Sequence, residues 1–403
     1  MDRADTTLAT TATTAKTVTS TATTSASVTK PKQRIRYFDI AKGIGILAVI
    51  LGHTLLETTE PDIAQVPVAD FFYRVCFSFH MPLFFLLSGY FMHPRRAFRW
   101  KKESRELLAT YGITAGAVLV FGAILAFIRR TGTLGAIWLW LKGGLYGVGD
   151  TYTRDLHPQI LWEVHTRIGA IWFLLALFWA HLIVTLAYKT KVPWLVVILS
   201  ATIGFATMPF FLLPWGIQAG MVAALFVYIG YLLRTINLFG RIAAHSIPMM
   251  ISVAVCAIIW ACDIYWFSGF AMAVNQYGTT PILTFAGAIA GPICVVALSM
   301  AIDKAKFGPR FLSTVGRSTL AILCVHLLED DVFPWGPLLY HLEKWCGIQW
   351  LWLPVFIVRV AVDLFLAYVL YKIPRINALF YPWLQNTRSK DTGKKTVKAN
   401  GQK

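Results

Sequence analysis

The sequence predicts an all-α polytopic membrane protein with about ten transmembrane helices. Of its 403 residues, 57% are hydrophobic and only 14% are charged, and the mean hydropathy is +0.59. A soluble domain carries roughly 25% charged residues, so the deficit indicates a membrane environment. The chain is long enough for about ten crossings when each takes roughly 20 residues and a short loop. No nucleic acid partner is expected despite the net charge of +17, because the basic residues lie in gaps between apolar runs, where they orient the helices.

The domain organisation follows from composition. Residues 1–33 form a Thr/Ala/Ser-rich tract with almost no aromatic side chains. Such a tract cannot bury enough surface to fold, which predicts a disordered cytoplasmic tail. It also lacks the apolar segment of a cleavable signal peptide, so we expect the first helix to be retained. Residues 34–380 are predicted to form one membrane domain and residues 381–403 a basic cytoplasmic tail, with no appended soluble domain.

Apolar runs separated by breaker residues predict each helix in turn. The runs lie near residues 37–57, 70–92, 107–128, 169–188, 192–211, 215–233, 247–267, 281–302, 313–333 and 351–372. With the N-terminus inside, most Lys and Arg residues fall in cytoplasmic gaps. The outer gaps contain only Arg129, Arg130, Lys142, Arg154, Arg167 and Lys344. This asymmetry predicts that both termini are cytoplasmic, and we expect a multi-pass protein of the plasma membrane.

The longest outer gap, near residues 129–168, contains the segment GAIWLWLKGGLYGVG at 135–149. Its apolar part is short and interrupted by glycine. This pattern favours an interfacial or re-entrant segment over a further crossing.

Three ionisable residues of the first helix predict a polar stripe. Lys42 and His53 are eleven residues apart, or about three turns, so they face the same way and lie roughly 16 Å apart along the axis. Asp39 lies on nearly the same face. Ionisable groups inside membrane helices usually face the bundle interior or a wet cavity. The alternative for Lys42 is that it snorkels to the cytoplasmic headgroups and pairs with Asp39.

The second helix reads FSFHMPLFFLLSGYFM at 77–92. It places His80 in the outer half of the membrane, at a depth comparable to that of His53. Pro82 loosens the backbone hydrogen bonding nearby. Ser88 and Gly89 lie closer to the cytoplasm, where a small pair allows close helix approach or the passage of a ligand.

The ninth predicted helix carries His326 about two turns below its outer end. Three acidic residues follow at that end, namely Glu329, Asp330 and Asp331. They either meet a polar acceptor or form an ordinary solvated helix end.

Two further features are interpreted as structural. Arg359 and Asp363 are four residues apart in the tenth helix, which is the spacing of an ion pair within a helix. His181 is alone on its helix, which is typical of a core histidine with its hydrogen bonds satisfied.

Four segments resemble the acyltransferase 3 family of multi-pass membrane acyltransferases. They are RYFDIAKGIGILAVILGH (36–53), FSFHMPLFFLLSGYFM (77–92), IWFLLALF (171–178) and VGRSTLAILCVHLL (315–328). The third segment and Lys42 are most similar to the fucose 4-O-acetylase-like branch. The resemblance implies transfer of an acyl group, usually acetyl from cytoplasmic acetyl-CoA, to a hydroxyl of a sugar, cell-surface glycan or lipid-linked precursor. The expected partners are therefore acyl-CoA, a glycan or glycolipid acceptor, and the lipid bilayer.

The family's essential pair in the first helix is an arginine and a histidine. His53 matches the histidine, whereas Lys42 occupies the position of the arginine. Lysine keeps the positive charge and loses the bidentate fork, so a phosphate contact would survive the change. Lys42 and Asp39 are then the expected cofactor-binding residues. The phosphates of acetyl-CoA are expected near Lys42 and the basic inner loops, with the pantetheine arm bringing the thioester to His53. His53 would act as general base or carry the acyl group transiently.

The remaining site assignments are candidates. His80 and His326 would orient His53, bind the acceptor or stabilise an oxyanion, and Ser88, Trp172 and Asp330 would bind substrate. No metal is predicted, because the six cysteines show no metal-ligand spacing. A proton-coupled transporter or exporter is the alternative function, since it also keeps ionisable residues inside a bundle.

Overall fold

The described part of the chain is helical. The computed structural model describes residues 34–59, 63–147, 149, 159–164, 166–207, 209–333, 335–347, 349–374, 376–382 and 384. The predicted tails, residues 1–33 and 385–403, lie outside the described residues. Within those residues the structure has no β-strand, only the isolated bridges Gln159–Leu212 and Ala271–Gln276. The all-α class is therefore confirmed.

Each of the ten predicted segments contains a helix. Among the described residues, eight helical runs are long and apolar enough to cross a membrane: α1 (Arg36–Thr59), α2 (Pro67–Phe91), α3–η2–α4 (Trp100–Arg129), η3–α7 (Gly169–Ala187), η4–α9 (Pro214–Thr235), α11 (Ile247–Tyr265), α12 (Pro281–Asp303) and α16 (Trp352–Lys372). A ninth crossing results if α13 (Pro309–Arg317) and α14 (Thr319–Val332) are counted together. The remaining predicted helix, near residues 192–211, is α8 (Pro193–Ala206), which has only 14 residues and is shorter than predicted.

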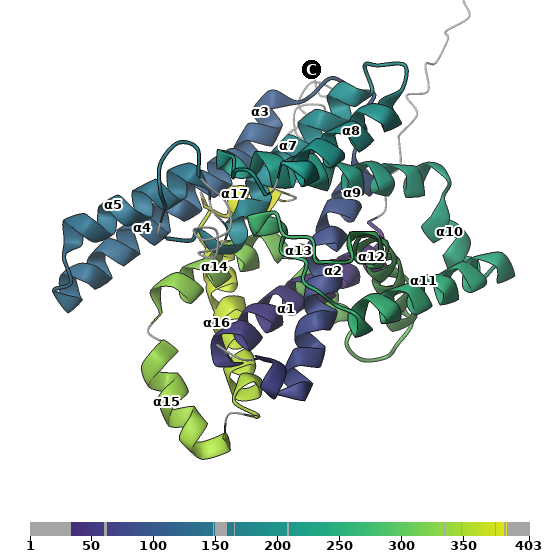
Figure 1. Ribbon diagram of the computed structural model, residues 1–403. Coiled ribbons are helices and arrows are strands. Elements are labelled where there is room, and N and C mark those ends of the chain that lie inside the picture. The colour runs from purple at the N-terminus through teal and green to yellow at the C-terminus, as the bar shows by residue number, and fades with distance from the viewer. Residues whose placement is uncertain are drawn as a thin grey trace, which may run out of the picture. The chain divides into compact units, whose positions relative to one another are not determined.

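Shorter elements connect the crossings. They are η1 (Ile63–Gln65), α5 (Thr133–Tyr146), α10 (Leu238–Ala243), η5 (Met272–Val274), α15 (Trp335–Cys346) and α17 (Asn377–Phe380). The segment predicted to be interfacial or re-entrant is largely α5, which packs along α4 (Figure 1). At 14 residues, α5 is about 21 Å long at 1.5 Å per residue, too short to cross the apolar layer of a bilayer.

A sharp bend separates α13 from α14. Their axes differ by 73°, and the bend lies at Ser318, two residues after Gly316. The Ser318 N–H reaches the carbonyls of both Thr314 and Val315, and the Thr319 hydroxyl bonds the Gly316 carbonyl. Glycine and serine close together are a common cause of helix kinks, because they leave backbone groups accessible to alternative hydrogen bonds.

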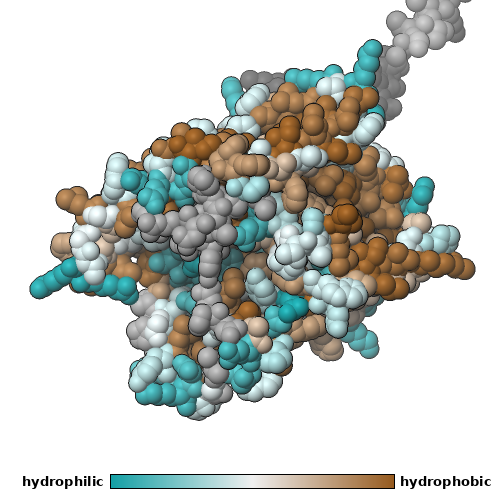
Figure 2. Space-filling view, in the orientation of Figure 1, coloured by the Kyte–Doolittle hydropathy of each residue, from teal (hydrophilic) through white to brown (hydrophobic). Residues whose placement is uncertain are grey.

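Two helices expose apolar side chains almost along their whole length. In α11, only 6% of the apolar window is buried, and Ile251 and Ile258 are among its exposed residues. Phe127 and Ile128 are exposed in the same way on α4. Figure 2 shows the hydrophobic surface gathered over α11. Such a surface is stable against lipid rather than water, so the chain is a multi-pass membrane protein.

Close helix crossings position α1 and α2. A Cβ on Gly316 of α13 would lie 1.7 Å from the Asp39 carbonyl oxygen of α1. At the crossing of α2 and α9, a Cβ on Gly89 would lie 1.9 Å from the Val227 oxygen, and one on Gly230 would lie 1.9 Å from the Leu86 oxygen. Only glycine permits backbones this close, so Gly89 provides the close helix approach that its sequence position predicts.

Helix α1 lies among α2, α12, α13 and α16 (Figure 1). Helix α14 packs against α1, α4 and α16, which brings residues from both ends of the chain together. We call the two ends of α1 the Lys42 end and the Glu57 end. The orientation of these ends relative to the cytoplasm stays a prediction, as does the plasma membrane location.

Candidate active site

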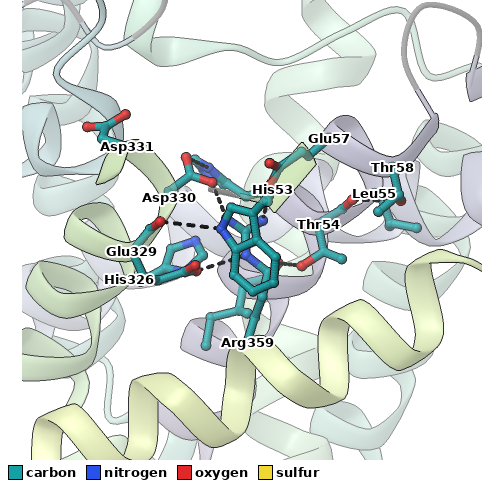
Figure 3. Close-up of polar contacts among 12 residues, drawn as sticks. His53, Thr54, Leu55, Glu57, Thr58, His326, Glu329, Asp330, Asp331 and Arg359 are labelled. Atoms are coloured by element: carbon teal, nitrogen blue, oxygen red, sulfur yellow. Dashed lines mark hydrogen bonds and ion pairs between the residues drawn. The ribbon is translucent and has the colours of Figure 1, made fainter. Parts of the chain in front are cut away.

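His53 and His326 meet in the interior of the bundle. Their rings are arranged edge to face, with centroids 5.3 Å apart. His326 is almost fully buried, whereas 21% of the His53 side chain is accessible. His53 therefore faces polar groups of α14 (Figure 3), and part of its side chain remains accessible.

Asp330 faces His53 and is held by two arginines. Its Oδ2 lies 3.7 Å from His53 Nδ1 and 3.0 Å from an Nη atom of Arg167. Its Oδ1 accepts a hydrogen bond from Arg359. The 3.7 Å separation from His53 is an ion-pair contact longer than a hydrogen bond. Because Nδ1 of His53 faces Asp330, its other ring nitrogen, Nε2, is left for a reactant.

His326 is fixed by two carboxylates. Its Nδ1 lies 2.9 Å from Glu329 Oε1 and 3.0 Å from Asp363 Oδ2. Its Nε2 is buried and has no hydrogen-bond partner among the described residues. A buried polar atom without a partner is costly, so it is a natural position for a contact with a bound molecule.

Arg359 joins these groups from α16. Its side chain is fully buried and forms ion pairs with Glu57 (2.9 Å), Glu329 (2.8 Å) and Asp330. Its guanidinium also lies over the Trp335 ring, 4.9 Å from the centroid.

The interpretation of Arg359 and Asp363 as an ion pair with each other is corrected by these contacts. Arg359 reaches across to α1 and α14, and Asp363 bonds His326 instead. Arg359 pairs with carboxylates of α1 and α14 rather than with Asp363 of its own helix. Those carboxylates face the guanidinium inside the bundle, where leaving them unpaired would be costly. We call His53, His326, Glu329, Asp330, Arg359 and Asp363 the histidine cluster.

The cluster contains one group that could hold a metal ion. Atoms of His326, Glu329 and Asp363 lie within 4.8 Å of one another, and all three residues are buried. However, the same Glu329 oxygen already bonds the Nε of Arg359 at 2.8 Å. A guanidinium in contact with a ligand oxygen opposes a second cation there, so we describe this group as part of an ion-pair network.

A pocket of about 410 Å³ borders the cluster at the Glu57 end. Its lining residues come from α1, α4, α14, α15 and the residue that follows α14. They are Glu57, Leu125, Arg129, Asp331, Val332, Phe333, Trp335 and Gly336. Glu57 lies one turn after His53, so the pocket and the histidine share the same face of α1.

A second polar chain lies toward the Lys42 end. The Ser88 hydroxyl is 2.7 Å from His181 Nε2, and His181 Nδ1 is 3.0 Å from Glu103 Oε2. This connects serine, imidazole and carboxylate in the order of a nucleophile, its base and the group that orients the base. His181 is thus satisfied as predicted, but its partners come from two other helices.

Lys42 and Asp39 lie near this second chain. The Lys42 ammonium lies over the Phe91 ring, 5.4 Å from the centroid, and Asp39 is buried. Their assignment to cofactor binding stays a prediction.

His80 and Trp172 have more local environments. His80 is buried, with Nδ1 2.6 Å from the Cys76 carbonyl oxygen of its own helix, and its ring contacts Phe77. Trp172 belongs to the main hydrophobic core and packs against Phe85. The contacts of these two residues are with their own helix or the core, and their proposed roles in catalysis and substrate binding stay predictions.

Sequence reasoning missed three polar partners. Glu57 carried a usable signal, because it lies four residues after His53 on the stripe already identified. Arg167 and Glu103 gave little signal in the sequence, since each lies at the edge of an apolar run among other charged residues.

Comparison with known proteins gives one match. A family model described as an acyltransferase domain matches residues 35–372. No curated protein matches the chain. No solved structure matches it either.

Proposed function

This chain belongs to the acyltransferase 3 family and is a membrane acyltransferase, and from that membership we propose that it transfers an acyl group, in the first instance acetyl, from acyl-CoA to a hydroxyl group of a sugar, cell-surface glycan or lipid-linked precursor. His53 acts as the general base, with transient acylation of its ring as the variant mechanism.

The placement of His53 carries this proposal. Its imidazole lies inside the bundle against His326 and Asp330, yet it remains 21% accessible. A general base needs this combination, since it must be oriented by fixed groups and also reach the proton that it removes. Asp330 faces Nδ1 of the ring at 3.7 Å, the side from which a carboxylate orients the base of a catalytic triad.

The proton and the leaving group can be followed through the reaction. Nε2 of His53 removes the proton of the acceptor hydroxyl as its oxygen attacks the thioester carbonyl. The new ester C–O bond forms, the C–S bond breaks, and the thiolate of CoA takes the proton from the imidazolium. Asp330 faces the positive charge that develops on His53 in between, which lowers the energy of that state.

His326 has the position of a supporting group. Its Nδ1 carries the proton that Glu329 and Asp363 accept, its Nε2 has no partner among the described residues, and its ring centroid lies 5.3 Å from that of His53. When Nε2 also carries a proton, it can donate to the oxyanion of the tetrahedral intermediate. His326 is therefore assigned to stabilising the oxyanion or positioning His53.

The donor is assigned to the Lys42 end. Lys42 supplies positive charge for the phosphates, and the roughly 16 Å between Lys42 and His53 suits an extended pantetheine arm. Ser88 lies on the adjacent helix at the same end and is assigned to contacts with the donor.

The test is acetyl transfer by purified full-length protein in lipid nanodiscs. With acetyl-CoA and a panel of sugar glycosides, mass spectrometry detects the acetylated product. We expect His53→Ala to abolish transfer, and His341→Ala, which changes an exposed histidine of α15, to retain it. Full activity of His53→Ala would remove the proposed mechanism. A wild-type protein that never transfers acetyl, yet moves a solute or protons across the membrane, would favour the transporter alternative.

A further inference from the structure

The pocket at the Glu57 end combines a few polar groups with an apolar wall. Leu125, Val332 and Phe333 line it together with the charged side chains of Glu57 and Asp331. Its volume of about 410 Å³ is within the roughly 300–1,000 Å³ of small-molecule sites. Few, well-placed polar groups in such a wall are typical of a site that fixes the orientation of its ligand.

Asp331 provides an unused acceptor atom. Its side chain is only 3% exposed, and Oδ1 lies 3.7 Å from the Nε of Arg167. Oδ2 is buried and has no hydrogen-bond partner among the described residues. A buried carboxylate oxygen without a donor is unfavourable, so a ligand that donates a hydrogen bond would be bound there. Figure 3 shows Asp331 to one side of the other carboxylates.

Glu57 connects the pocket to the reacting histidine. Its side chain is 28% exposed and pairs with Arg359 at 2.9 Å. It lies one turn from His53 on the same face of α1. A ligand in contact with Glu57 would therefore lie about one helical turn from the imidazole.

The charges of the wall select the chemistry of the ligand. Asp331 and Glu57 line the pocket, whereas Arg167 and Arg359, which pair with them, do not. The two carboxylates accept hydrogen bonds from hydroxyl groups and disfavour a carboxylate or a phosphate. Arg129 is the cation of the lining, and its side chain is exposed, so solvent screens its attraction for an acidic ligand.

We propose that this pocket binds the acceptor as one neutral, hydroxylated sugar ring, with Asp331 and Glu57 accepting hydrogen bonds from its hydroxyl groups. That the bound sugar is the acceptor rests on the proposed acyl transfer, whereas the binding of a sugar in this pocket does not. The ring places one hydroxyl at His53, and uronic acids or phosphorylated sugars are rejected by the two carboxylates.

The probes are methyl glucoside and methyl glucuronide, which share a ring and differ by one carboxylate. Full-length protein in nanodiscs is assayed for sugar binding by saturation-transfer NMR and for transfer from acetyl-CoA. We expect the wild-type protein to bind the glucoside at least tenfold more tightly than the glucuronide. Asp331→Asn should weaken glucoside binding about tenfold, which is the order of one lost hydrogen bond to a charged group. The KM for acetyl-CoA should stay unchanged. The control is Glu343→Gln, the same chemical change at an exposed position of α15.

A second variant fills the pocket. Leu125→Trp should abolish glucoside binding while acetyl-CoA still binds, which keeps the proposal testable if Asp331→Asn fails to fold. Equal use of the two sugars, no binding of the glucoside by wild type, or unchanged glucoside affinity in both pocket variants would overturn the proposal. Glucoside binding that depends on Asp331, in a protein that transfers no acetyl group, would uphold the pocket and overturn the proposed function. Acetyl transfer that is unchanged in both pocket variants would uphold the proposed function and overturn the assignment of the pocket.

Discussion

The imidazole rings of His53 and His326 lie edge to face, 5.3 Å apart, and each turns its Nδ1 toward acidic groups. His53 faces Asp330 at 3.7 Å, while His326 contacts Asp363 at 3.0 Å. The two rings differ in accessibility, with 21% of the His53 side chain exposed and 1% of the His326 side chain. From this difference we propose that the accessible ring meets the reactants and that the buried ring holds it in place.

Removing the carboxylate behind His326 should slow the reaction without weakening substrate binding. Asp363→Asn keeps the shape of the side chain but loses the charge that holds His326 Nδ1. We expect kcat to fall about tenfold to a hundredfold, below the roughly 10²–10⁴-fold effect of a direct acid or base, with both KM values little changed. Steady-state kinetics with each substrate measures this.

The matched control for Asp363 is Asp263→Asn. Asp263 is a buried carboxylate of α11 with an oxygen that has no hydrogen-bond partner among the described residues, and it lies outside the histidine cluster. Asp363→Glu should recover part of kcat. If both Asn variants lose activity equally, the loss reflects general damage to the bundle rather than a role for His326.

Arg359 should dominate the stability of the cluster. It is fully buried against Glu57, Glu329 and Asp330, so Arg359→Ala leaves acidic groups without their cation. We expect a loss of about 3–5 kcal/mol, measured as the unfolding free energy in detergent micelles. Arg359→Lys should be intermediate, because lysine keeps the charge but cannot bond several carboxylates in a plane.

An exposed ion pair provides the comparison for Arg359. Arg36 pairs with Asp303 and is 50% exposed, so Arg36→Ala should cost less than about 1 kcal/mol. Similar losses for Arg36→Ala and Arg359→Ala would show that the buried network adds no particular stability.

The sequence predicts the polar face of α1 well, because that face depends only on the helical period. His53 and Lys42 lie where the 3.6-residue repeat places them, and Glu57 extends the same stripe. The three partners of Arg359 were not predictable from its own helix, since they depend on how α16 crosses α14 and α1. The short length of α8 was also missed, because hydropathy alone does not show where packing and loop contacts end a helix.

The charge at the donor end should matter more than its exact chemistry. If Lys42 binds phosphate, Lys42→Arg should keep the KM for acetyl-CoA within about threefold, whereas Lys42→Ala should raise it about tenfold or more, since an ionic hydrogen bond is lost. Lys344→Ala at the far end of the bundle is the control. Equal losses for the arginine and alanine variants at position 42 would remove the phosphate role.

Ser88 is the most informative residue for the path of the acyl group. Serine and threonine hydroxyls inside helices often bond a carbonyl of their own helix, as those of Thr54 and Ser299 do. The Ser88 hydroxyl instead contacts His181, which Glu103 holds from the other side. This geometry fits either a nucleophile or a fixed donor contact.

The position of Ser88 favours the donor contact. It lies near Lys42, roughly 16 Å of helix axis away from His53, which is too far for an acyl group on Ser88 to reach a hydroxyl held at His53. We therefore expect Ser88→Ala to raise the KM for acetyl-CoA several-fold while kcat stays within about threefold of wild type. The control is Ser299→Ala, since Ser299 is a buried serine of α12 that bonds its own backbone. Incubating His53→Ala with radiolabelled acetyl-CoA decides the matter: label recovered on a peptide containing Ser88, together with loss of turnover in Ser88→Ala, would make Ser88 a covalent carrier.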